Sequence, residues 1–125
     1  MCAKRPSPRR ELPVSPEDCT LLADAMMLLF EDMTFDFAAH GVDYDHANAA
    51  YDRLFSGQTA LTLLETQAVG VLVRLALVRL ADASFRLPDL ERSEPELLPS
   101  LRRRSARLTE LSSLLAASGQ PSRSI

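Results

Sequence analysis

Apolar residues are most evenly spread between residues 60 and 81, where ALTLLETQAVGVLVRLALVRLA is apolar on nearly every side of a helix. A helix that is apolar all round is buried. Leu and Ala dominate the segment, and it is much longer than an ordinary strand of about 5–6 residues, so the pattern favours helix over strand. We therefore expect an all-α fold, a small bundle of about four helices around a central apolar helix at residues 60–84.

The central segment carries its own start signal and argues against a membrane span. Thr62 and Glu65 have the spacing of a capping box, and Thr59 offers an alternative N-cap one turn earlier. Arg74 near the middle of the segment would be costly in a bilayer, so we expect no membrane span. Gly70 lowers helix propensity and indicates a close crossing by another helix.

Two further helices are predicted before the central one. Ser15 followed by Pro16 is typical of a helix start, and this helix is expected to continue to about His40. A second helix is expected from Asp43 as N-cap to about Phe55. The core-facing positions of the first helix recur at helical spacing and are Leu22, Ala25, Met26, Leu29, Met33 and Phe37.

Proline, glycine and charge patterns divide the rest of the chain. Residues 1–15 are basic and proline-rich and are expected to be a disordered tail. Residues 16–84 form the predicted helical core domain, residues 85–95 a connector, residues 96–118 the last helix, and residues 119–125 a frayed tail. The last helix begins either near Ser93, with Glu96 completing a capping box, or with Pro99 as its first residue.

Composition is that of an ordinary soluble domain. The chain has 125 residues, of which 46% are hydrophobic and 25% charged. Cys2 and Cys19 form no metal-type or redox-type pair, and the N-terminus lacks the apolar core of a signal peptide. We expect an intracellular protein, cytoplasmic or, if eukaryotic or viral, nuclear.

An acidic and histidine-rich cluster follows the first apolar stripe. Asp32, Asp36 and His40 are spaced four apart and share one helix face, a geometry that suits a divalent metal. Solvated acids and helix caps account for the same residues, and helical metal sites use Glu-x-x-His pairs that this chain lacks. We predict no metal and no cofactor. The whole cluster comprises Glu31, Asp32, Asp36, His40, Asp43, Asp45 and His46.

Arg74 lies near the middle of the most apolar part of the chain. A buried arginine needs an acidic partner, and Asp32 and Asp36 flank the stripe of the first helix. A structural ion pair with them, or a snorkelling side chain, is favoured over an anion-binding role.

Arginines at the two ends of the chain offer an alternative function. The basic run after residue 101 could follow a phosphate backbone, but no recognition helix accompanies it. The formal net charge of -3 gives no global case for nucleic acid either, so we expect weak, sequence-independent binding at most. The residues of this alternative are Arg9, Arg10, Arg102, Arg103 and Arg107.

Surplus apolar surface favours a protein-binding function. No catalytic arrangement or phosphate loop is present, so we predict no enzyme. We predict a small helical protein–protein interaction module, an adaptor, assembly factor or accessory subunit that works as an oligomer or within a complex. The alternatives are a nucleic-acid-associated regulatory protein and a helical ligand- or metal-binding protein. The predicted interaction residues are two off-stripe aromatics and a narrow leucine stripe with one arginine, namely Phe30, Phe35, Leu101, Arg104, Leu108, Leu111 and Leu115.

Overall fold

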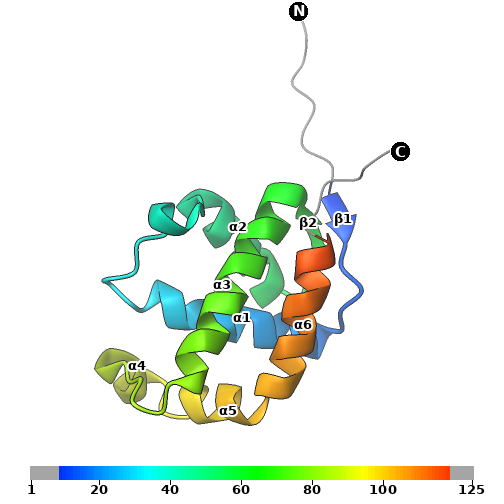
Figure 1. Cartoon of the computed structure of the whole chain (residues 1–125). Helices are drawn as coiled ribbons and strands as arrows, with labels where there is room; N and C mark the ends of the chain where they lie inside the picture. The colour runs from blue at the N-terminus through cyan, green and yellow to red at the C-terminus, as the bar shows by residue number, and fades with distance from the viewer. Residues whose placement is uncertain (1–8, 119–125) are drawn as a thin grey trace, which may run out of the picture.

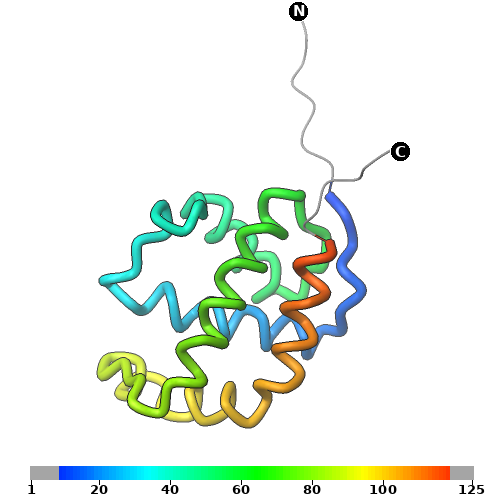
Figure 2. The backbone as a smooth tube through the Cα atoms, in the orientation of Figure 1, coloured from blue at the N-terminus to red at the C-terminus, as the bar shows by residue number. Residues whose placement is uncertain are grey.

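The computed structural model describes residues 9–118 and confirms an all-α fold with one small sheet (Figures 1 and 2). The long helix α3 packs against α1, α2, α5 and α6 and so forms the centre of the bundle. In chain order the elements are β1 (Arg9–Glu11), α1 (Pro16–Phe30), the 3-10 helix η1 (Ala38–His40), α2 (Tyr44–Phe55), β2 (Ala60–Thr62), α3 (Leu63–Ala81), α4 (Pro88–Ser93), α5 (Leu97–Arg103) and α6 (Ser105–Ser118).

The helix α3 begins at the predicted capping box, but it is shorter at both ends than the predicted range of residues 60–84, because residues 60–62 form β2 and the helix ends at Ala81. The Thr62 hydroxyl accepts from the Glu65 backbone N–H at 3.1 Å, and the Glu65 carboxylate accepts from the Thr62 N–H at 2.9 Å. The expectation that this helix is buried on all sides is not met, since the side chains of Leu64 and Val78 are exposed to solvent. Among residues 9–118, no helix has both the length and the apolar character that a bilayer crossing requires.

The predicted N-terminal tail is too long. Arg9–Glu11 pairs antiparallel with β2, and the Leu12 N–H donates to the Thr59 carbonyl at 3.0 Å. Leu12 is also buried against the core. Strand pairing and one buried leucine therefore order a segment whose composition favours disorder, while residues 1–8 lie outside the described part of the chain.

The first helix ends ten residues earlier than predicted. Asp32 accepts from both the backbone and the hydroxyl of Thr34, at 3.0 and 2.7 Å, and this turn replaces the next helical turn. Met33, predicted in the core, is therefore 94% exposed. The α2 prediction is confirmed, since Asp43 accepts from the N–H groups of Asp45 and His46.

The C-terminal part contains three helices where one was predicted. The connector holds α4, and the predicted helix at residues 96–118 is divided at Arg104 into α5 and α6. Neither predicted start is used, because α5 begins at Leu97 after Glu96, which makes no side-chain capping bond. Figure 1 shows α6 beside α3. The leucine stripe is buried in the domain's own core, so the prediction that it faces a partner is wrong; its members are Leu101, Leu108, Leu111 and Leu115.

Candidate interaction surface

Aromatic rings gather where α1, η1 and α2 meet. Phe30 lies at the centre, with its ring centroid 5.4 Å from those of Phe37 and Tyr51 and 5.7 Å from that of Tyr44. Phe35 and Phe37 form a T-shaped pair with their ring centroids 4.7 Å apart. These distances and the mainly edge-to-face geometry are those of favourable aromatic pairs. The early end of α1 makes this possible, because the chain turns back and brings residues 35–37 over Phe30.

Arg79 of α3 connects this network to the end of α1 and to the loop after α3. Its guanidinium donates to the Asp32 carboxylate, and its carbon Cζ lies 5.3 Å from the Phe35 centroid and 5.7 Å from that of Phe85. Burial raises the pKa of Asp32, but hydrogen bonds from Thr34 and Arg79 lower it by more, so this pKa lies below its usual range. The aspartate is thus held ionised and Arg79 is neutralised locally.

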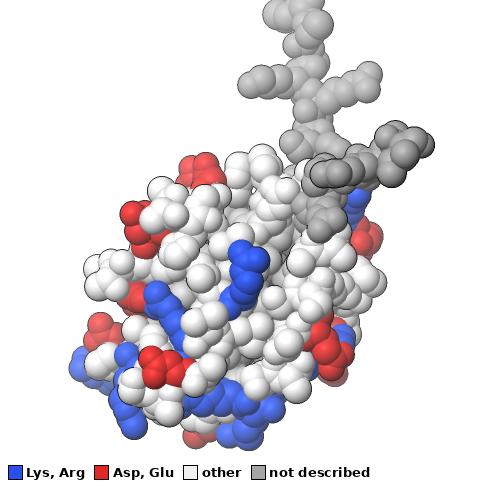
Figure 3. All heavy atoms as spheres, in the orientation of Figure 1, with Lys and Arg blue, Asp and Glu red and all other residues white. Residues whose placement is uncertain are grey.

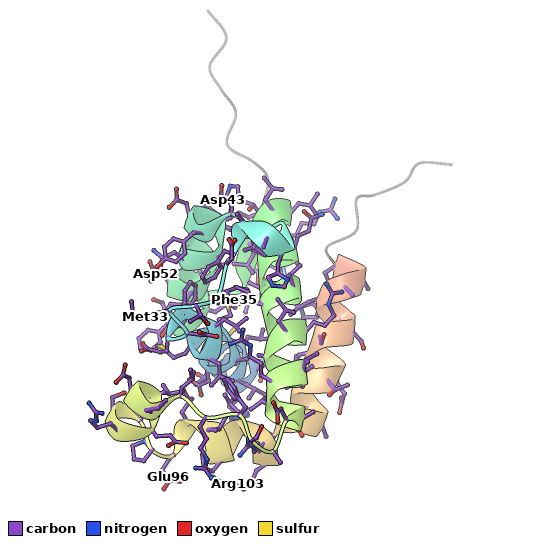
Figure 4. All side chains as sticks on the ribbon, turned by 60° about the vertical axis from the view of Figure 1, so that its left-hand side comes forward. Met33, Phe35, Asp43, Asp52, Glu96 and Arg103 are labelled. Atoms are coloured by element: carbon purple, nitrogen blue, oxygen red, sulfur yellow. The ribbon has the colours of Figure 1, made fainter. Side chains whose placement is uncertain are left out.

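Part of the network is open to solvent. Met33, Phe55 and Tyr44 are 94%, 71% and 52% exposed. Phe55 stacks on Tyr51 at 5.9 Å and so extends the network beyond its half-buried centre. Figure 4 shows Met33 and Asp52 along one edge of the molecule, with Phe35 further in. We call the set formed by Met33, Phe35, Phe37, Tyr44, Tyr51 and Phe55 the aromatic surface.

Acidic side chains surround the aromatic surface. Between residues 31 and 55 the chain has six acids and one arginine, and that arginine, Arg53, lies 3.5 Å from Glu65. Figure 3 shows red side chains over the α2 and η1 side and most of the blue ones at the α4–α5 end. The surface therefore combines apolar rings with a negative rim whose exposed members are Glu31, Asp36, Asp43, Asp45 and Asp52.

The ion pair predicted for Arg74 is wrong. Arg74 is exposed, and Arg79 takes the place opposite Asp32. Asp36 forms no ion pair with either arginine in the described part of the chain. Its carboxylate instead accepts a hydrogen bond from the Ala39 N–H at 3.2 Å. Arg74 and Arg79 are five positions apart and therefore lie on different faces of α3, and the early end of α1 decides which face Asp32 meets.

The predicted basic residues are not brought together. Arg9 and Arg10 lie in β1, while Arg102 and Arg103 lie in α5 at the other end of the molecule (Figure 1). Arg102 donates to the carbonyl groups of Leu80, Asp82 and Phe85 and so covers the end of α3.

Two other arginines of the predicted sets also face the chain's own acids. Arg107 forms a two-pronged ion pair with Asp18, at 3.0 and 2.7 Å. Arg104, predicted to reach an acid across an interface, lowers the pKa of Asp24 in α1, although burial keeps that pKa raised overall. These arginines therefore stabilise the domain itself.

The acids and histidines of residues 31–46 are not arranged as metal ligands. In the part of the chain that the structure describes, no three His, Cys, Asp or Glu side chains are placed to hold one ion. His40 instead stacks on Phe35 at 5.0 Å, with the rings nearly parallel.

Comparison with known proteins adds no functional assignment. No known protein family matches the chain, and searches among curated proteins and among solved structures find no similar chain either.

The sequence singles out Phe30 and Phe35 but not most of the rings around them. The rings that it does not single out as interaction residues are Phe37, Tyr44, Tyr51 and Phe55, and Phe37 is predicted on the core-facing stripe of the first helix. The available signal was density, because six of the seven aromatic residues of the chain fall between residues 30 and 55.

Proposed function

We propose that this chain is a small protein-interaction module whose partner binds the aromatic surface. The observation that carries the proposal is the exposure of Met33, Tyr44 and Phe55 beside one continuous aromatic network. Large apolar side chains exposed together favour a binding site, and aromatic residues and Met are enriched in protein interfaces. An adaptor, an assembly factor and an accessory subunit are all modules of this kind.

The charge of the rim indicates the chemistry of the partner. Within residues 9–118 the exposed acids of this region form no ion pair with Arg53 or Arg79, because Arg79 is held by Asp32 and Arg53 lies beside Glu65. A partner with apolar anchors flanked by Lys or Arg would meet both the rings and the acids, and opposite charge speeds association. We therefore propose a protein segment with basic and apolar residues as the partner.

Paired variants of exposed residues test this proposal. Met33→Gln with Phe55→Gln removes two apolar anchors, whereas Val78→Gln changes an exposed residue of α3 that has no part in the ring network. Tagged wild type and variants are recovered from the cells that naturally make the protein, and co-purifying proteins are quantified by mass spectrometry. We expect one partner or more to be retained by wild type and Val78→Gln and reduced at least tenfold by the double variant, since interface anchors contribute about 2 kcal/mol or more each.

The salt dependence of partner binding and the size of the recovered complex distinguish the possible outcomes. The retained partner should dissociate faster as ionic strength rises, because the rim attraction is screened. Recovery of the chain as a monomer, or recovery of the same proteins with all three forms, would contradict the proposal.

A further inference from the structure

A groove unrelated to the aromatic surface lies between α3 and α6. Its volume is about 520 Å³, which falls in the range of small-molecule sites of about 300–1,000 Å³. Gly70, Val71 and Leu115 supply apolar lining, and the loop residue Gly41 borders it. The polar lining comes from both helices and consists of Gln67, Arg74, Ser112 and Ser113.

Gly70 lines this groove and has no side chain to fill it. A Cβ at that position would lie 3.6 Å from the Leu115 Cβ, an ordinary contact, so the crossing of α3 and α6 does not itself demand glycine. Glycine in the middle of a helix is destabilising relative to alanine. From α6, the small residues Ser112 and Ala116 also line the groove. The space between the helices is therefore left open by residues that packing alone does not require.

Arg74 gives the groove its chemistry. It is exposed and forms no hydrogen bond or ion pair with the described residues, whereas Arg79 and Arg107 of the same domain are both paired. None of the described residues that line the groove is acidic. A guanidinium has five N–H donors and no acceptor, and its planar fork fits a carboxylate with two parallel hydrogen bonds.

We propose that the α3–α6 groove binds a small organic acid, with its carboxylate on Arg74 and its apolar body over Gly70, Val71 and Leu115. Among the described residues a single cation lines the groove, so a monoanion matches its charge better than a phosphate dianion does. The hydroxyl groups of Ser112 and Ser113 lie on the same lining and are suited to donate hydrogen bonds to the carboxylate.

Chemical shift mapping by NMR on the full chain tests this inference with simple probes. Octanoate carries both the carboxylate and the apolar body, 1-octanol lacks the charge, and acetate lacks the body. We expect octanoate to shift the amide signals of Gly70, Val71, Arg74, Ser112 and Ser113, and to bind at least tenfold more tightly than either other probe.

Two variants and a matched control separate this site from general binding. Arg74→Gln should weaken the binding of octanoate about tenfold, because it removes the positive charge and the two parallel hydrogen bonds to the carboxylate. Ala116→Leu fills the groove from an exposed position of α6 and should weaken octanoate similarly while the helical content stays unchanged. Arg103→Gln, a change at an exposed arginine of α5, should have no effect.

Three results would overturn the inference. The first is equal binding of octanoate and 1-octanol, and the second is an equal effect of Arg74→Gln and Arg103→Gln. The third is a set of shifted signals that falls on the aromatic surface instead of the groove. Each result leaves the proposed protein-binding function untouched, because that function rests on different residues.

Discussion

Asp18 combines a local role with a long-range one. It completes the capping box of α1 with Ser15, at 3.1 Å in both directions, and it accepts two hydrogen bonds from Arg107 of α6. The first contact follows from sequence spacing, whereas the second depends on how the chain folds back over 89 residues. At the scale of residues, helix caps could be predicted from the sequence and ion-pair partners could not. Asp32 is a second example, because its partner is Arg79 and not the predicted Arg74.

The Asp18 contacts give a prediction about pH. The hydrogen bond from Arg107 is the main reason why the pKa of Asp18 is lowered from 3.8 to about 2. A carboxyl group whose pKa is lowered by folding stabilises the folded state fully above its ordinary pKa, and loses this effect as the pH falls toward the folded value. The contribution at pH 7 is therefore at most about 2 kcal/mol.

Carboxyl NMR titration measures this effect directly. We expect an Asp18 pKa of about 2 in wild type. In Arg107→Gln that pKa should move back toward its ordinary value, and the free energy of unfolding at pH 7 should fall by about 1–2 kcal/mol. The stability difference between the two proteins should shrink between about pH 4 and pH 2. An unchanged Asp18 pKa in the variant would show that the ion pair is absent in solution.

At the scale of elements, helix type and most starts could be predicted, but ends and contacts could not. Apolar periodicity identifies α1, α2 and α3, and local caps fix where α2 and α3 begin. The end of α1 depends on the turn at Asp32, whose carboxylate is held by Arg79 from another helix. The position of α6 depends on α3, so a narrow leucine stripe could not reveal whether it faces its own domain or another chain.

Two leucines of α3 test how this helix is buried. Leu72 and Leu75 both lie mid-helix in the most apolar segment, so the sequence alone predicts a loss of about 2–5 kcal/mol when either is changed to Ala. The structure, however, buries Leu72 fully and Leu75 only in part. Leu72→Ala should therefore lower the free energy of unfolding by about 2–5 kcal/mol through lost burial and a cavity. Leu75→Ala should lower the free energy of unfolding by about 1 kcal/mol, because the side chain of Leu75 buries less apolar surface on folding.

Urea unfolding followed by circular dichroism compares the two leucine variants. Equal losses in both would mean that α3 is rotated or enclosed differently from the arrangement described.

At the scale of the whole molecule, the aromatic rings gather in one region whose exposed charges are mostly acidic, whereas the α4–α5 end carries charges of both signs. Every aromatic residue belongs to one network, either directly or through Arg79, and the acids of residues 31–55 surround its exposed part. The sequence indicated surplus apolar surface and attributed most of it to the leucines of the last helix. Those leucines complete the core, and the surplus lies instead at the junction of α1 and α2. Surface location depends on the packing of all helices at once, which periodicity within one helix does not encode.

The most direct test of the proposed interaction is oxidative footprinting of Met33 in the free chain and in the complex recovered from its natural cells. Met33 is 94% exposed, and Met26, which is fully buried, serves as the internal control. In the free chain Met33 should oxidise far faster than Met26. In the complex its oxidation should slow at least fivefold, because an interface core excludes solvent. If Met33 oxidises equally fast in both samples, the aromatic surface does not bind the partner.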